Sequence, residues 1–342
     1  MLKTLTAVIP TRNRPNDLAK AVASVYAQTR PLDEFIIVDQ SPNDQSRILV
    51  ESLAPKDART QLIYIHDPLI SGLVEAKRVA AERASGDIVC FLEDDVILEP
   101  DYIEQIERGF IKQPEMVGCC GIVTNPPHQP IGYEFIFHLF HRGIFSDKRV
   151  GIYGRFSGRG HAMIASQMLS GGSSAWRREV FPVVPFDVAN GIHLLEDNDF
   201  STRVAKHFGP RLYINPNARL EHHWSPVNRD VLGSFQRRKL VAYIVYFKKR
   251  RDWPAAAFAL SWLLLGLFFE ATFRAFSARS FDPIQGYFSG MREGFAKRVV
   301  VHESRTHLLY MAMFCQNEWI APIPLEICIT LIYPPRRMSI SR

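Results

Sequence analysis

Cysteine is scarce in this sequence, and its spacing excludes two common roles. The five cysteines form no Cys-x-x-Cys pair and are scattered over the chain at Cys90, Cys119, Cys120, Cys315 and Cys328. An odd, scattered set argues against a disulfide framework and favours a reducing compartment. The run that contains Cys90 is apolar throughout, which is typical of a buried strand.

The sequence also lacks targeting and nucleic-acid-binding motifs. The apolar run Met1–Pro10 is short and is followed by Arg12 and Arg14 without a cleavage-site pattern, so no signal peptide is expected. Internal repeats and low-complexity tracts are absent. The net charge is +6 and the pI is near 9.1, but no recognition helix, zinc finger or RNA-binding motif accompanies this charge. Nucleic-acid binding is therefore the weaker interpretation of the basic charge.

Hydrophobic residues are plentiful, at 47% of the 342 residues against 22% charged residues, so a sizeable core is expected and disorder is not. Much of the basic excess falls between Arg237 and Arg251, just before the most hydrophobic stretch of the chain. A basic segment beside an apolar one is typical of a membrane surface.

The first hundred residues alternate between strand and helix patterns. Apolar, β-branched runs predict buried strands, and apolar residues at helical spacing predict helices between them. The expected strands are Leu5–Ile9, Phe35–Val38, Leu62–Ile65 and Ile88–Leu92, and the expected helices are Asp17–Gln28 and Leu73–Ala84. This alternation predicts an open parallel sheet covered by helices.

Polar groups follow three of these strands: Thr11 and Arg12 after the first, Asp39 after the second, and Glu93–Asp95 after the fourth. Ligands of such sheets bind beyond the carboxyl ends of the strands. The three strand ends therefore predict one functional site.

The chain is less regular after about residue 110. Gly154–Gly160 has the composition of a mobile loop, and the region around it is expected to face an acceptor. Helical spacing returns in Gly191–His207, and Leu212–Ile214 and Ala218–Leu220 are expected to be short strands.

The C-terminal region contains one long apolar segment. Ala255–Phe269 is free of charge, and Glu270 and Arg274 then interrupt it. As a helix it spans roughly 22 Å, short of the roughly 30 Å hydrocarbon core. A shallow, tilted or re-entrant membrane helix, a full span and a buried soluble helix all stay open. Ile320–Tyr333 is apolar but interrupted by proline, which excludes a spanning helix.

Three adjacent carboxylates, Glu93, Asp94 and Asp95, repel one another unless a cation or water satisfies them. Oxygen ligands at a strand end suit Mg²⁺ or Mn²⁺, with substrate phosphates completing the shell. The alternative is a solvated acidic turn.

Four segments together resemble family 2 glycosyltransferases of the GT-A fold. They are VIPTRNRPNDLAKAVASVYAQT, FIIVDQSPNDQS, SGLVEAKRVAAERASGDIVCFLEDDVILEPDYI and LLEDNDFSTRV, and they stand in the order and spacing of that family over about residues 4 to 232. The resemblance implies a GT-A (Rossmann-like), mainly parallel α/β sheet flanked by helices, followed by a mostly helical C-terminal extension.

The resemblance also implies a set of donor-binding residues. Glu93 and Asp95 match the acidic ends of the DxD motif, with Asp95 the better metal ligand, and Asp39 matches the carboxylate that binds the base. The remaining positions implied to bind the donor are Pro10, Thr11, Arg12, Lys77, Arg78, Asp94, Gly172 and Glu196.

Asp197 matches the second residue of the family's Glu-Asp motif, which implies that it is the general base. A sugar hydroxyl that attacks an anomeric carbon must lose its proton, and a positioned carboxylate accepts it. Taken alone, Glu196 and Asp197 are typical of the acidic first turn of a helix. One base and no obvious nucleophile favour inversion at the anomeric carbon.

Two histidines follow the last expected strand, and the resemblance implies that one of them binds the metal or the diphosphate. Neighbouring side chains on a strand face opposite ways, so we expect only one, His222 in preference to His223, to face the site. Trp176 and Trp224 are candidates to stack on a sugar, although core packing is the usual role of tryptophan.

These observations predict a glycosyltransferase domain over residues 1–232, with a donor half to about 110, an acceptor half from about 111, and a membrane-associated helical region over 233–342. The expected activity is inverting transfer from a nucleotide-diphosphate sugar, a UDP-sugar by default, to a carbohydrate or lipid-linked acceptor at the cytoplasmic face of a membrane. The expected cofactor is Mg²⁺ or Mn²⁺. One alternative is an inactive scaffold of the same fold. A nucleotidyltransferase is disfavoured, because VIPTRNRP has no glycine.

Overall fold

The computed structural model describes residues 4–300 except 56–58, 127–131, 133–134, 136, 138, 141–159, 192–193, 228–230 and 251–252. By its internal contacts the chain divides into Met1–Val300 and Val301–Arg342. The second unit lies outside the described residues, and so does most of the expected loop 154–160. The expected domain boundary near residue 232 stays a prediction.

The first four strands form the parallel half of the sheet. They are β1 (Leu5–Thr11), β2 (Glu34–Asp39), β3 (Gln61–His66) and β4 (Ile88–Leu92), in the spatial order β3-β2-β1-β4. All their pairings are parallel, and β1, β2 and β4 are buried along their whole length. Continuous apolar runs form such strands because both faces of the sheet are covered.

The second half of the sheet is mixed. Its strands are β5 (Val96–Leu98), β6 (Gly118–Val123), β7 (Ile164–Ser166), β8 (Ser173–Arg177) and β9 (Leu212–His222), and the order continues β4-β8-β6-β9-β5, with β7 beside β9. β8 pairs antiparallel with β4 and β6, and β6 pairs parallel with β9. The two short strands expected after residue 211 are one strand, β9, whose pairing with β6 shifts register between Cys120 and Ile122.

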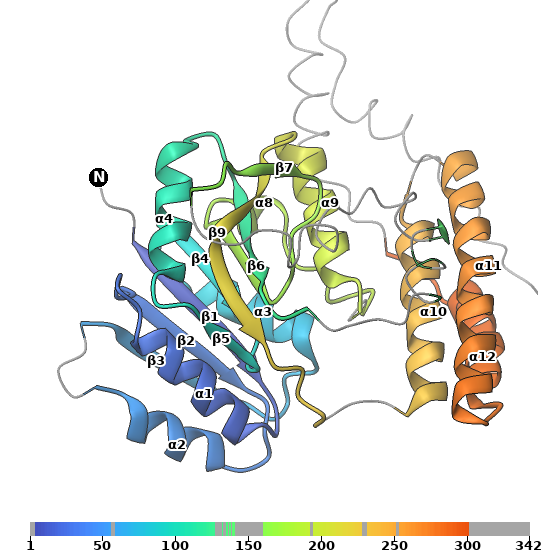
Figure 1. Ribbon diagram of the computed structural model, residues 1–342, viewed down its shortest axis with the longest axis horizontal. Helices are drawn as coiled ribbons and strands as arrows, with labels where there is room; N and C mark the ends of the chain where they lie inside the picture. The colour runs from blue at the N-terminus through green and yellow to red at the C-terminus, as the bar shows by residue number, and fades with distance from the viewer. Residues whose placement is uncertain are drawn as a thin grey trace, which may run out of the picture. The chain divides into compact units, whose positions relative to one another are not determined.

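Helices cover both faces of the sheet (Figure 1). α1 (Pro15–Tyr26), α2 (Gln45–Leu53) and α4 (Tyr102–Lys112) bury apolar side chains in the cluster that contains Ala7. α3 (Leu73–Arg83), α8 (Val180–Val183) and α9 (Glu196–Phe208) bury theirs in the cluster that contains Val8. Adjacent residues of β1 therefore belong to opposite cores, as the alternation of a strand requires.

α9 begins at Glu196, five residues later than the helical spacing from Gly191 predicts. Its first turn holds Glu196, Asp197 and Asp199. Carboxylates are favoured at this end because the first N–H groups of a helix are unpaired and the macrodipole is positive there.

Three helices follow the sheet: α10 (Leu232–Lys248), α11 (Trp253–Ala278) and α12 (Asp282–Ala296). α11 continues past the charge-free run Ala255–Phe269, because Glu270 is buried and its carboxylate binds Lys239 of α10 and Arg274 of its own helix. Within the described residues, Pro254–Ala278 is the one helix long and apolar enough to cross a membrane.

Candidate active site

The carboxyl ends of β1 and β4 and the end of β9 bring polar side chains together. β4 leads directly into Glu93–Asp95, and β5 pairs with β9 so that Val96 lies opposite His222. This pairing joins residues that lie far apart in the sequence at one end of the sheet, where ligands of open α/β sheets bind.

Asp94 is held by the loop that follows β1. Thr11 Oγ1 donates to Asp94 Oδ2 at 2.7 Å, and Arg14 Nη1 lies 2.9 Å from Asp94 Oδ1 and 3.7 Å from Asp95 Oδ2. Burial raises the pKa of Asp94 to about 6, although Arg14 and Thr11 oppose this shift. Arg14 thus offsets part of the repulsion between neighbouring carboxylates.

Glu93, Asp95 and His222 form a three-residue cluster with the chemistry of a cation site. His222 Nε2 lies 3.0 Å from Glu93 Oε2 and 3.0 Å from Asp95 Oδ1. These three side chains offer ligand atoms within 4.8 Å of one another. Two carboxylates and an imidazole are ligands that Mn²⁺, Mg²⁺ and Zn²⁺ accept in different proportions.

The surroundings of Asp95 favour a ligand role. The backbone N–H of Ser225 donates to Oδ2 at 2.8 Å. Oδ1 is buried and faces His222 Nε2 at 3.0 Å, although the angles between them fall outside those of a normal hydrogen bond. The Ser225 N–H thus holds the carboxylate with Oδ1 turned toward His222, an orientation that fits a metal ligand.

Charge around the cluster is strongly coupled. Burial alone would raise the pKa of Asp95, but His222, the Ser225 N–H and Arg14 outweigh it and hold that pKa below its ordinary value. Burial disfavours the charged imidazole of His222, yet Asp95 and Glu93 raise its pKa to about 9. The two carboxylates therefore favour positive charge at this position, carried either by a protonated imidazole or by a cation bound beside the neutral imidazole.

Two glycines separate the cluster from the start of α9. A Cβ on Gly172 would lie 2.4 Å from Glu93 Cδ, and a Cβ on Gly171 would lie 2.3 Å from Glu196 Oε1 and 3.1 Å from Asp197 Cβ. A side chain at either position would therefore displace these carboxyl groups. The Gly171–Gly172 turn thus lies between the cation cluster on one side and the Glu196–Asp197 pair on the other.

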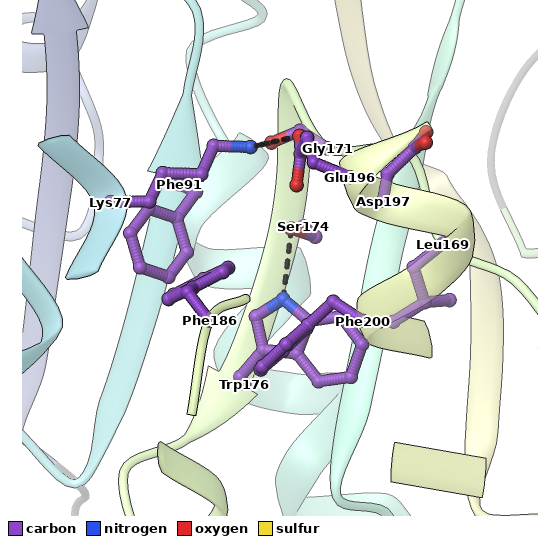
Figure 2. Close-up of a pocket in the computed structure, with 10 residues that line it drawn as sticks. All are labelled: Lys77, Phe91, Leu169, Gly171, Ser174, Trp176, Phe186, Glu196, Asp197 and Phe200. Carbon is purple, nitrogen blue, oxygen red and sulfur yellow. Dashed lines mark hydrogen bonds and ion pairs between the residues drawn. The ribbon is translucent and has the colours of Figure 1, made fainter. Parts of the chain in front are cut away.

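Lys77 of α3 fixes Glu196 beside this turn (Figure 2). Its Nζ lies 2.5 Å from Glu196 Oε1 and donates to the Gly171 carbonyl at 2.9 Å. Burial raises the pKa of Glu196, and Lys77 opposes that shift. In Figure 2 the Asp197 carboxylate points away from Lys77, although Asp197 shares the first turn of α9 with Glu196, which binds that lysine.

The next expected site residues lie at the ends of β1 and β2. Pro10 and Thr11 are in β1, and exposed Arg12 follows them. Asp39 is fully buried and accepts hydrogen bonds from Ser41 N–H at 2.9 Å and Tyr64 Oη at 2.6 Å, so it turns the chain after β2.

Arg78 differs from its neighbour Lys77, because its guanidinium binds Glu82 and Glu75 on the same helix instead of the acidic cluster. His223 is also directed elsewhere, toward Glu221 at 2.9 Å. The expected role of Arg78 in donor binding stays a prediction, and of the two histidines it is His222 that faces the cluster.

Comparison with known proteins identifies the family. The model described as "Glycosyl transferase family 2" matches residues 6–181. The chain belongs to this family. It is 26% identical over 216 residues to a glucosyl-dolichyl phosphate glucuronosyltransferase of Haloferax volcanii, a match that covers 61% of this chain and 65% of the relative. It is 34% identical to a putative teichuronic acid biosynthesis glycosyltransferase, TuaG, of Bacillus subtilis, over 30% of this chain and 40% of the relative.

A solved structure supports the fold. A mannosyltransferase from Pyrobaculum calidifontis, solved in complex with GDP-Man and Mn²⁺, matches with a TM-score of 0.55 and 15% identity, over 86% of this chain and 88% of that one. The expected GT-A-type fold and the resemblance to family 2 are confirmed. The chain spans less than two thirds of the length of these two curated relatives, 65% of the first and 40% of TuaG.

The two tryptophans of this family 2 chain have different environments. Trp176 is buried, and its ring packs edge-on against Phe200 at 4.9 Å, so it belongs to the core. Trp224 is partly exposed and stacks on His222 at 4.4 Å. Trp224 therefore orients the imidazole and keeps an exposed ring surface beside the cluster.

Sequence reasoning missed Arg14 and a group of paired charges on and next to α9. Lys249, just beyond α10, binds both Asp187 and Asp199, and Asp199 also binds Arg203 at 2.9 Å. Tyr246 Oη lies 3.0 Å from Thr202 Oγ1. The sequence shows the basic run Arg237–Arg251, but nothing in its pattern indicates that Lys249 turns inward to two aspartates.

We expect Lys249→Met to lower the free energy of unfolding by about 2 kcal/mol at neutral pH, because two buried carboxylates lose a partner. Burial favours the neutral form of Asp187, but Lys249 and Asn190 outweigh it and lower its pKa. A lowered pKa contributes stability above the unfolded value of about 3.9 and loses it as pH falls through the folded value. The difference between variant and wild type should therefore shrink below about pH 4.

Urea unfolding at several pH values measures this difference. Lys206→Met is the matched control, because Lys206 is an exposed lysine on α9. A pH-independent loss, or an equal loss in both variants, would show that the ion pairs do not stabilise the fold.

Proposed function

We propose that this family 2 chain is a metal-dependent, inverting glycosyltransferase that moves a sugar from a nucleotide-diphosphate sugar to an acceptor hydroxyl. The observation that carries the proposal is the arrangement around Gly171–Gly172. A three-ligand cation cluster lies on one side of this turn, and an acidic helix start lies on the other. Donor activation and acceptor deprotonation need two such groups next to each other.

Glu93, Asp95 and His222 are the residues that would hold the cation. When bound, a divalent cation supplies positive charge that stabilises the departing diphosphate. The Pyrobaculum calidifontis structure contains Mn²⁺ and a GDP-sugar, which supports Mn²⁺ or Mg²⁺ and a nucleotide donor here. We assign Thr11, Asp39 and Lys77 to the walls of the donor site, and a UDP-sugar is the first donor to test.

Asp197 is assigned as the general base. Its carboxylate takes the proton of the acceptor hydroxyl while that oxygen forms a bond to the anomeric carbon. The bond between the anomeric carbon and the diphosphate oxygen breaks on the opposite face, and the nucleoside diphosphate leaves with the electron pair. One displacement inverts the configuration. Glu196 is the positioning residue, because Lys77, which also donates to the Gly171 carbonyl, fixes it one residue before the base.

We further propose a lipid-linked or carbohydrate acceptor at the cytoplasmic face of a membrane. The Haloferax volcanii relative is named for glucosyl-dolichyl phosphate, which is a lipid-linked sugar. TuaG is named for teichuronic acid biosynthesis. The apolar helix α11 after a basic segment is consistent with synthesis of cell-surface polysaccharide or glycoconjugate at that face.

Hydrolysis of a panel of UDP-, GDP- and dTDP-sugars by the purified chain tests this proposal, because water replaces the acceptor. We expect release of sugar from one donor class with Mn²⁺ or Mg²⁺ and background release with EDTA. NMR should show the inverted anomer as the first product. Retention of configuration would overturn the inverting mechanism, and metal-independent release would overturn the cation site. No binding of any donor with any cation would favour an inactive scaffold.

A further inference from the structure

The polarity of α11 is reversed relative to a helix of a water-soluble core. Its acid, Glu270, is buried and bound by Lys239 and Arg274. Its exposed residues between Pro254 and Ala278 include no charged side chain in the described structure. A surface helix in water places its charges outward, whereas a helix in lipid turns them toward its neighbours.

Large apolar side chains form a stripe along the exposed side of α11. They recur every three or four residues at Phe258, Trp262, Leu265, Phe269, Phe273 and Phe276. Phe140 packs on Trp262 and Phe269 in the middle of the stripe, whereas Phe258 and Phe276 near its ends are 75% and 86% exposed. We call these six residues the aromatic stripe.

The C-terminal segment that contains α11 is strongly basic. Residues 232–300 contain twelve Lys and Arg and four Asp and Glu, a net charge of +8, whereas the whole chain carries +6. The rest of the chain is therefore slightly acidic. An apolar helix face within a basic segment matches an anionic lipid surface. Apolar rings enter the boundary between headgroups and acyl chains, and basic side chains attract the anionic headgroups.

Charges on α10 and α12 exclude a simple spanning arrangement. Arg237 of α10 binds Glu293 of α12 at 3.3 Å, and both side chains are about half exposed, at 53% and 48%. α10 and α12 pack closely, as Gly290 shows: a Cβ at this position would lie 2.6 Å from the Arg237 carbonyl oxygen. If α11 crossed the bilayer together with its two partners, this exposed ion pair would enter hydrocarbon, which is costly.

We propose that the aromatic stripe of α11 binds the surface of an anionic bilayer, with α11 lying in the interface and not crossing it. The inference builds on the proposed function, because it supplies the surface that brings the active site to a lipid-linked acceptor. Lipid contact explains three features together: the uncharged exposed side of α11, the burial of Glu270 and the basic charge of residues 232–300.

Flotation of the full chain with phosphatidylcholine vesicles, with and without phosphatidylglycerol, tests this proposal. We expect binding that requires phosphatidylglycerol and that falls roughly tenfold or more in Phe258→Ser/Phe276→Ser, since two exposed rings leave the interface. The matched control is Ile48→Ser/Leu69→Ser, which removes two apolar side chains that are 64% and 89% exposed elsewhere. Equal binding by all three proteins would overturn the assignment of the stripe.

Depth measurements separate interfacial binding from spanning. Nitroxides are attached at Phe258→Cys, Leu265→Cys and Phe276→Cys in turn, with Cys315 and Cys328 replaced by serine, since Cys90, Cys119 and Cys120 are buried. An interfacial helix predicts three similar, shallow depths. A deep label at position 265 between two shallow ends would overturn the proposal in favour of a span.

Donor hydrolysis in vesicle-free solution keeps the two proposals apart. Phe258→Ser/Phe276→Ser should hydrolyse the nucleotide sugar at the wild-type rate, because the stripe contributes no residue to the active site. Hydrolysis without vesicle binding by the wild type would overturn the membrane proposal alone. Vesicle binding without hydrolysis would leave the membrane surface standing and overturn the proposed function.

Discussion

Replacement of Asp197 by asparagine is expected to lower kcat by a factor of about 10² to 10⁴, the usual contribution of a positioned general base. Asparagine keeps the size of the side chain and the oxygen that accepts from the Asn198 N–H at 2.8 Å, but it cannot accept the acceptor's proton. The cation cluster is untouched, so KM for the donor and cation-dependent donor binding should stay near wild type. Steady-state kinetics with donor and calorimetry of donor binding measure the two effects separately.

Asp282→Asn makes the same chemical change at an exposed position at the start of α12 and should leave both quantities unchanged. If Asp197→Asn kept more than about a tenth of the wild-type turnover, another group would have to take the proton. A loss confined to donor binding would likewise place Asp197 in the donor site and not at the acceptor.

Lys77→Met is expected to lower the free energy of unfolding by about 3 kcal/mol, because it strands a buried acid. The side chains of Lys77 and Glu196 are 3% and 9% exposed, so water replaces little of the lost interaction. Methionine keeps the volume of the lysine stem against Phe91, over which the Lys77 ammonium now lies. Urea unfolding of Lys77→Met and Lys77→Met/Glu196→Gln measures the effect, and the double variant should be the more stable of the two.

The pH dependence of this loss has a definite sign. Burial already raises the pKa of Glu196, and removal of Lys77 removes the main opposing charge. A carboxyl group whose folded pKa is raised contributes stability below the unfolded pKa and loses it as pH rises through the folded value. Lys77→Met should therefore approach wild type as pH falls toward about 4. A loss that is the same at every pH would show that cavity formation, and not the stranded charge, sets the cost.

The parallel half of the fold was predictable because its signals are local. Continuous apolar runs located β1, β2, β3 and β4, and the polar residues after them located the site edge. Strand alternation implied that only one of His222 and His223 would face the site, but it did not determine which of them. The cluster itself follows from one pairing, β5 with β9, that sequence periodicity cannot specify.

The missing parts depend on contacts between distant segments. Arg14 neutralises Asp94 from 80 positions away, and Lys249 reaches Asp187 from 62 positions away. Glu270 interrupts the charge-free run in the sequence, yet a lysine on α10 binds it and α11 continues to Ala278. Hydropathy treats each charge as exposed, and only tertiary structure shows which charges are paired inside.

Calorimetric titration of a nucleoside diphosphate into wild type and Asp95→Asn, with Mn²⁺ or EDTA, tests the central claim most directly. Wild type should bind at least about tenfold more tightly with Mn²⁺ than with EDTA, since Glu93, Asp95 and His222 would hold a cation whose charge attracts the diphosphate. Asp95→Asn should lose this difference and keep the weak binding seen with EDTA, whereas Asp282→Asn should match wild type. Binding that does not depend on the cation, or that survives unchanged in Asp95→Asn, would contradict a metal-dependent donor site at the end of β4.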